Sequence, residues 1–232
     1  MERHAEKILE KMKSPNYADL NFDFAFKLTN ESERGALLVG TGKIEEYLEK
    51  LIITILPKEK KGYKEKLLNY PGPLSSFSGK IEILYAFRII DKRVYLALST
   101  LRKLRNNAAH SSNTYSLQEI KKSLEDIYDF EEMFRQVVHK LALNHLISWK
   151  KEQIKNGLIE EKLDADFDYE MLWNERFPNP EDNEILQEQL TIWKLAFGLT
   201  FLCLKLEVIT EEYSSEIETD GTWFDLRNKN KT

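Results

Sequence analysis

The stretch Leu101-Arg-Lys-Leu-Arg-Asn-Asn-Ala-Ala-His110 closes an apolar-periodic segment with three cations, two amides and a histidine. Apolar residues recur through this segment at intervals of four, three, three and four, at Val94, Leu98, Leu101, Leu104 and Ala108. Such a period predicts a helix that is buried along one stripe. Ser111, Ser112 and Asn113 then break the pattern, so the helix is expected to end there.

The same kind of periodicity runs through most of the chain and predicts an all-α protein, a bundle of about five to seven helices. Six prolines and nine glycines in 232 residues are few for an all-β or a disordered chain. Helices are expected at 2–13, 31–56, 81–90, 94–108, 116–149 and 184–209. The helix from residue 116 is expected to open with a capping box, Ser116-Leu-Gln-Glu119, and to run on toward Trp149.

The segments between these helices have other patterns. Leu20-Asn-Phe-Asp-Phe-Ala-Phe26 alternates with a strand period but has no second strand to pair with, so we expect an extended arm that lays Phe22, Phe24 and Phe26 into a groove. Residues 58–69 read as a basic linker, and residues 158–183 as an acidic loop insert. The expected division of the chain is an N-terminal helix and arm at 1–30, a helical domain at 31–157 and 184–210, the insert at 158–183, and a flexible tail at 211–232.

Composition excludes several classes of protein. Hydrophobic residues make up 42% of the chain and charged residues 31%, which suits a protein with a core and a solvated surface. The most apolar window, 190–206, is short for a membrane span and contains Lys194 and Lys205. The start of the chain does not resemble a signal peptide, and the one cysteine, Cys203, allows no disulfide within the chain. We therefore expect a cytoplasmic protein without membrane contact.

The net charge of −5 argues against a protein that coats nucleic acid along its whole surface. The charge is unevenly distributed, because residues 80–110 carry seven cations and two anions. That segment has a net charge of +5 and the remainder −10. Two interpretations stay open: the cations form a solvated helix face, or they form a local site for an anion.

The stretch Pro71-Gly-Pro-Leu-Ser-Ser-Phe-Ser-Gly-Lys-Ile81 predicts a fixed turn followed by a helix N-terminus. An exposed helix N-terminus can hold a phosphate, so Ser76, Ser78 and Lys80 are candidate phosphate-binding residues. The alternative is that the serines only cap the helix.

On a straight helix, Arg102, Asn106 and His110 are four residues apart and form one polar stripe. Arg105 and His110 are five apart and diverge by about 140°. They cannot meet on one phosphate within one regular helix. Either the helix ends near Asn107, or the two side chains act across a dimer interface.

Arg105-Asn106 followed by His110 resembles the R-N-x-x-x-H motif of the HEPN superfamily of small helical domains. Three further segments resemble the mannitol operon repressor (MltR) family: Glu31-Ser-Glu-Arg-Gly-Ala-Leu-Leu38, Glu45-Glu-Tyr-Leu-Glu-Lys-Leu51, and the Gly72-Pro-Leu turn with Phe77-Ser and Lys80-Ile. The MltR resemblance implies a HEPN-like bundle and a transcriptional regulator that acts mainly through protein–protein contacts. A recognisable DNA-reading helix is not expected.

The HEPN resemblance implies a second function, a metal-independent ribonuclease of the toxin or phage-defence kind. Two antiparallel protomers would form one composite groove, so a homodimer with an RNA or a regulatory protein partner is expected. Arg105, Asn106 and His110 would be catalytic, and Arg102 and Lys103 would contact phosphate. Two structural alternatives stay open: His110 caps the helix C-terminus, or Arg105 pairs with an acidic residue of 31–49. No fingerprint of a nucleotide cofactor or of a metal ligand set is present.

Overall fold

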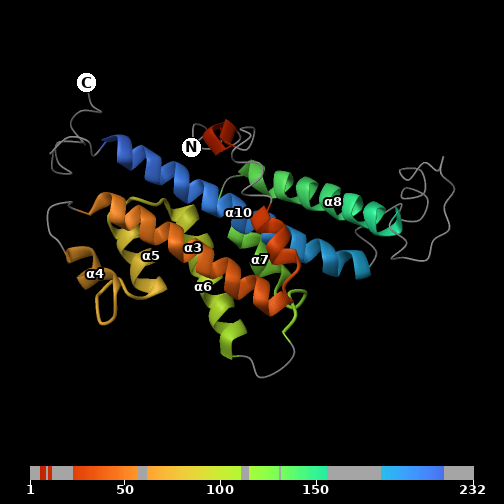
Figure 1. Cartoon of the computed structure of the whole chain (residues 1–232), viewed down its shortest axis with the longest axis horizontal. Coiled ribbons are helices and arrows are strands. Elements are labelled where there is room, and N and C mark those ends of the chain that lie inside the picture. Colours follow the sequence, from red (N-terminus) through yellow and green to blue (C-terminus); the bar gives the residue numbers. More distant parts are fainter. Residues whose placement is uncertain are drawn as a thin grey trace.

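The computed structural model describes residues 6–8, 10–11, 23–56, 62–110, 115–130, 132–155 and 184–216. Within these ranges the regular structure is helical and no strand occurs, which confirms the all-α prediction. The helices with full bounds are α3 (Glu33–Ile55), α4 (Tyr63–Leu68), α5 (Phe77–Ala86), α6 (Lys92–His110), α7 (Lys121–Tyr128), α8 (Glu132–Lys155) and α10 (Glu184–Glu216) (Figure 1).

The longest helix, α10, is the centre of the bundle. It is apolar on most of its circumference, and nearly every residue from Leu190 to Ile209 is buried. It packs chiefly against α3 and also against α8 and α7. The close approach of α3 and α10 depends on a glycine of α3, because a Cβ on Gly40 would lie 2.3 Å from Cδ1 of Leu199 on α10. The sequence prediction of a central final helix is confirmed.

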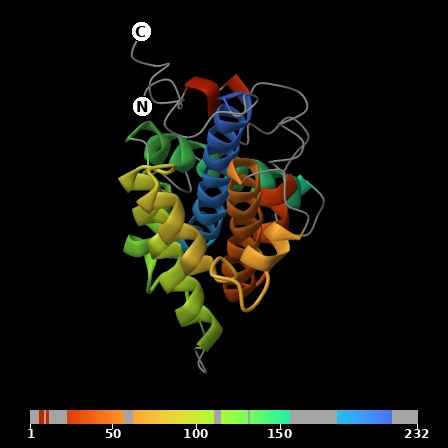
Figure 2. The ribbon, with the colours of Figure 1, turned by 90° about the vertical axis from the view of Figure 1, so that its left-hand side faces the viewer.

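The helices α5 and α6 pack side by side, and α3 packs against both of them (Figure 2). The buried stripe of α6 consists of Val94, Ala97, Leu98, Leu101, Leu104 and Ala108, which includes all five residues of the predicted stripe. The C-terminal end of α6 projects beyond the neighbouring helices in both views (Figures 1 and 2). The last residues of α6, up to His110, therefore extend past the neighbouring described helices.

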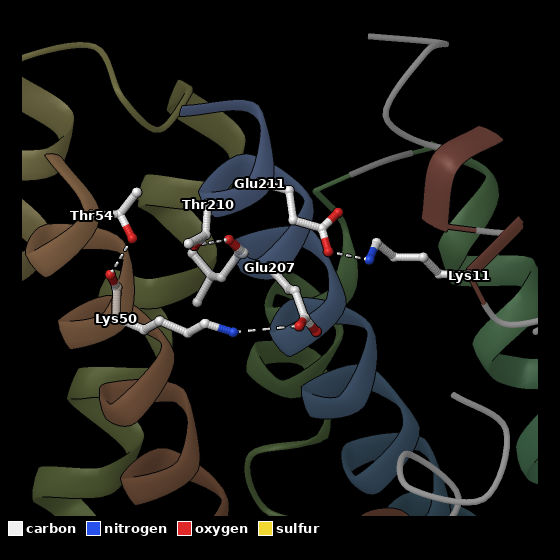
Figure 3. Close-up of polar contacts among 7 residues, drawn as sticks. Lys11, Lys50, Thr54, Glu207, Thr210 and Glu211 are labelled. Atoms are coloured by element: carbon white, nitrogen blue, oxygen red, sulfur yellow. Dashed lines mark hydrogen bonds and ion pairs between the residues drawn. The ribbon is translucent and has the colours of Figure 1, made fainter. Parts of the chain in front are cut away.

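The C-terminal half of α10 carries an acidic row that lysines from two other segments neutralise (Figure 3). The ammonium nitrogen of Lys50 on α3 lies 3.5 Å from a carboxylate oxygen of Glu207. Lys11 forms an ion pair with Glu211, and the ammonium nitrogen of Lys7 lies 2.6 Å from a carboxylate oxygen of Glu212. Ile8, between these two N-terminal lysines, is completely buried. Two ion pairs thus hold the beginning of the chain against the end of α10, and a buried isoleucine lies between the two lysines that make them.

One prediction for the N-terminal half of the chain is wrong and another is incomplete. Residues 23–29 are helical rather than extended, because Ala25 and Leu28, three residues apart, supply the buried face. The ring of Phe26 packs edge-on against Trp193, and Phe22 lies outside the described residues. The basic linker contains α4, a six-residue helix without a buried residue.

The predicted helix from residue 116 is also wrong in two places. Ser116 makes no capping box, because its hydroxyl accepts from the N–H of Gln118 and α7 begins only at Lys121. A break after Tyr128 then separates α7 from α8, with Phe130 buried at the break. At the other end, α10 continues to Glu216, so the helical domain does not stop at residue 210. The acidic insert at 158–183 and the tail from residue 217 lie outside the described residues.

Candidate functional site at the end of α6

The start of α5 has the geometry that its serines predict. The side chain of Ser76 accepts a hydrogen bond of 3.0 Å from the N–H of Gly79 and caps the helix. Ser75 instead donates to the carbonyl of Gly72 in the preceding turn. A Cβ on Gly79 would lie 2.7 Å from the carbonyl oxygen of Pro73, so the turn folds tightly onto the first turn of the helix. Ser76 therefore has a structural use as a cap.

Arg102 and Ser78 are brought together by the packing of α5 on α6. A guanidinium N–H of Arg102 donates to the hydroxyl oxygen of Ser78, and both residues are partly buried. This bond holds the arginine against α5. A guanidinium has about five N–H donors, and this bond uses one of them. Two of the predicted phosphate-binding residues, 24 positions apart in the chain, are thus neighbours.

Lys80 does not have the role predicted for it. Its residue is 1% exposed, and its ammonium nitrogen lies 2.5 Å from Oε1 of Glu45 and 2.7 Å from Oε1 of Glu49. Burial lowers the pKa of Lys80, but hydrogen bonds and charge attraction from the two glutamates outweigh it and raise the pKa above its ordinary value. The ammonium group is bound by two glutamates of α3, so the prediction that Lys80 binds phosphate is wrong.

The last two turns of α6 expose the polar residues of the motif. Leu104 and Ala108 face inward, whereas Lys103, Arg105, Asn106 and His110 are exposed. A guanidinium N–H of Arg105 donates to the side-chain oxygen of Asn106 over 3.2 Å. Among the described residues neither Arg105 nor His110 forms an ion pair, so the predicted alternative of an acidic partner for Arg105 within 31–49 is not observed.

The helix α6 is continuous through His110, which excludes one of the two geometries open to the motif. The possibility that the helix ends near Asn107 is wrong. Arg105 and His110 therefore point about 140° apart on one helix. Asn106 and His110, four residues apart, share a face. A single chain brings Arg102 to Ser78 and Arg105 to Asn106, but it does not bring Arg105 to His110.

A cavity that the sequence patterns did not single out lies at the other end of α6, where α5 ends and α10 passes. Arg88, at its edge, has a positive φ directly after α5, where glycine is usual, but no sequence pattern marks this position. In the described part of the chain there is no cluster of three or more residues able to hold a metal ion. None of the described helices has both the length and the apolar character needed to cross a membrane.

Comparison of the chain with protein-family models, with curated proteins and with solved structures gives no significant match.

Proposed function

We propose that the chain is a regulator of the MltR type that acts mainly through protein–protein contacts. The observation that carries the proposal is a set of exposed or half-buried apolar side chains on α5, in the turn after it and on the first turns of α6. Phe87 is 64% exposed, Leu96 is 50% exposed, and Tyr85 is stacked on Tyr95 with ring centroids 4.2 Å apart. We call Tyr85, Phe87, Tyr95 and Leu96 the α5–α6 surface.

The composition of this surface favours a protein partner over nucleic acid. Aromatic residues are enriched in protein interfaces, where they bury much area at a small cost in side-chain entropy. The stacked tyrosines are held in place before binding, since the hydroxyl of Tyr95 also donates to Glu82 over 3.1 Å. The resemblance of residues 31–51 and 72–81 to the MltR family supports the same function.

A transcript comparison tests the proposal. Deletion of the gene from its native host should raise a defined set of transcripts, and the wild-type chain supplied in trans should lower them again. The double variant Phe87→Ser/Leu96→Ser should fail to restore repression while folding normally. Val39→Ser is the matched control, because Val39 is also 50% exposed but lies on α3. A deletion that changes no transcript contradicts the regulatory role.

A second candidate function is metal-independent RNA cleavage, which the exposure of Arg105, Asn106 and His110 favours. A histidine with a pKa near neutrality can take the 2′-hydroxyl proton or protonate the leaving oxygen. A guanidinium can hold the phosphate as charge builds on it. Because one continuous helix separates Arg105 from His110, such a site needs Arg105 of one protomer and His110 of its partner.

Complementation between inactive variants tests this second function. Total or transfer RNA is incubated in chelator with wild type, with Arg105→Ala, with His110→Ala, and with a refolded mixture of the two variants. Each variant alone should be inactive, and the mixture should regain about a quarter of wild-type cleavage, since half the dimers are mixed and each has one intact site. Lys122→Ala is the matched control, because Lys122 is an exposed lysine on α7. Equal cleavage by wild type and both variants, or none by any, removes the nuclease function.

A further inference from the structure

A cavity of about 500 Å³ lies between the turn that joins α5 to α6 and the C-terminal part of α10. This volume is within the range of about 300–1,000 Å³ that small-molecule sites occupy. Its lining residues are Tyr85, Arg88, Ile89, Ile90, Asp91, Lys92, Ile209, Glu212 and Tyr213. Ile89, Ile90 and Ile209 are buried and give the cavity an apolar floor, with two tyrosine rings beside it.

The lining of this cavity carries two cations and two anions, and both anions already have hydrogen-bond or ion-pair partners within the chain. The carboxylate of Asp91 accepts the N–H groups of Arg93 and Val94 at 2.8 and 3.0 Å, and Glu212 is ion-paired with Lys7 at 2.6 Å. Arg88 and Lys92 are exposed and form no ion pair with any residue of the described ranges. The cavity therefore presents two cations to an anion that enters from solvent.

The backbone at Arg88 gives an independent reason to look for a ligand. Arg88 has a φ of 58° and is the non-glycine residue with positive φ in the described chain. The turn it makes ends α5, with the N–H of Ile89 donating to the carbonyl of Leu84 over 2.9 Å. This position after a helix is usually glycine, since a Cβ is unfavourable in the left-handed conformation. Backbone strain of this kind clusters at binding sites, so an arginine at this position is a reason to look for a ligand there.

We propose that this cavity binds a small aromatic anion of the size and chemistry of a nucleoside monophosphate. The anionic group would lie between the Arg88 guanidinium and the Lys92 ammonium, where charge-assisted hydrogen bonds are strongest. The flat ring would pack over Ile209 and against the tyrosine rings, which gives stacking without a demand for one particular base. The inference does not depend on the RNA-cleavage function, because none of the residues of the α6 end lines the cavity. Of the α5–α6 surface, Tyr85 lines the cavity and Phe87, Tyr95 and Leu96 do not.

Calorimetric titration of the full chain with the four ribonucleoside 5′-monophosphates, and with inorganic phosphate alone, tests the proposal. At least one mononucleotide should bind with a Kd below 1 mM and more tightly than phosphate. Arg88→Gln should raise this Kd at least about tenfold, because a charge-assisted contact is lost. Arg93→Gln is the matched control, since Arg93 is an exposed cation one residue beyond the cavity lining and should leave the Kd within about twofold.

Arg88→Gly separates the ligand site from a structural use of the arginine. Glycine relieves the left-handed backbone, so this variant should keep or raise the Tm while it loses binding. A fall in Tm would show that the side chain stabilises the turn, and this would overturn the argument from the backbone. Absence of binding by all four nucleotides up to 1 mM, or an unchanged Kd in Arg88→Gln, would overturn the site.

Discussion

The ammonium group of Lys80 on α5 lies 2.5 Å from a carboxylate oxygen of Glu45 on α3, in a place where the lysine is almost fully buried. Glu49, one turn further along α3, contributes a second contact of 2.7 Å. A buried cation between two carboxylates ties α5 to α3 at a fixed register. Since α6 packs on both helices, this ion group helps to set where the end of α6 stands.

Lys80→Met should destabilise the protein, because two carboxylates then face each other without a cation. Breaking a buried pair costs about 3–5 kcal/mol, and the partial exposure of both glutamates lowers the expected cost to about 2–3 kcal/mol. Urea unfolding measures it as a shift in midpoint at constant slope. Lys43→Met is the control, because the exposed Lys43–Glu46 pair should contribute no more than about 0.5 kcal/mol. Equal losses in the two variants would contradict the role given to burial.

Two glycines in helices should respond to alanine in opposite directions. A Cβ at Gly198 would lie 2.5 Å from Cδ1 of Tyr128 and 3.2 Å from its Cβ, so Gly198→Ala must displace a buried ring. We expect a loss of about 1–3 kcal/mol, as for other overpacked cores. A Cβ added at Gly42 would meet no atom of another part of the structure within 4 Å. Gly42→Ala should therefore raise the free energy of unfolding by about 0.5–1 kcal/mol through helix propensity. Thermal unfolding of both variants measures the two changes in stability. If both variants were more stable than the wild type, the close packing of α10 on α7 would be contradicted.

His145 should make stability depend on pH in the acidic range. Its ring is stacked with Trp193 at 5.8 Å and lies 5.1 Å from the ring centroid of Phe197, and burial lowers its pKa below the ordinary value. The unfolded chain then binds the proton first, so stability is complete above about pH 6.5 and decreases as the pH falls below it. His145→Phe keeps the aromatic packing and should remove this part of the decrease. The measurement is the free energy of unfolding of the wild type and of His145→Phe at pH 7.5 and 5.5. If stability decreased by the same amount in both proteins, the role given to His145 would be contradicted.

The positions of the helices could be predicted where a single apolar period runs uninterrupted, as in α3, α6 and α10. The arm around Phe24 could not, because alternating phenylalanines suggested a period of two while Ala25 and Leu28 carried the burial. The break after Tyr128 was missed for a similar reason. Phe130 continues the apolar pattern on both sides of the turn, so periodicity alone does not show that the chain changes direction there.

The candidate site was predictable in part, because the sequence shows which residues share a helix but not which helix lies opposite. The sequence predicts phosphate contacts for both Arg102 and Ser78, yet only the packing of α5 on α6 shows that they bond to each other. The charge of Lys80 predicts a phosphate contact, but its burial depends on two glutamates that lie about 30 or more residues earlier in the chain. No motif marks Arg88 in the sequence, because its positive φ appears only in the folded chain.

The exposed residues at the end of α6 should contribute little to stability, in contrast to the serine that caps α5. Arg105→Ala and His110→Ala should each change the free energy of unfolding by no more than about 0.5 kcal/mol, because neither side chain is buried or ion-paired within the described residues. Ser76→Ala should cost about 1 kcal/mol, since it leaves the N–H of Gly79 without its acceptor. Chemical denaturation of the three variants measures these values. A large loss in Arg105→Ala or His110→Ala would mean that the motif holds the fold together, and a loss of RNA cleavage in that variant would then say nothing about chemistry.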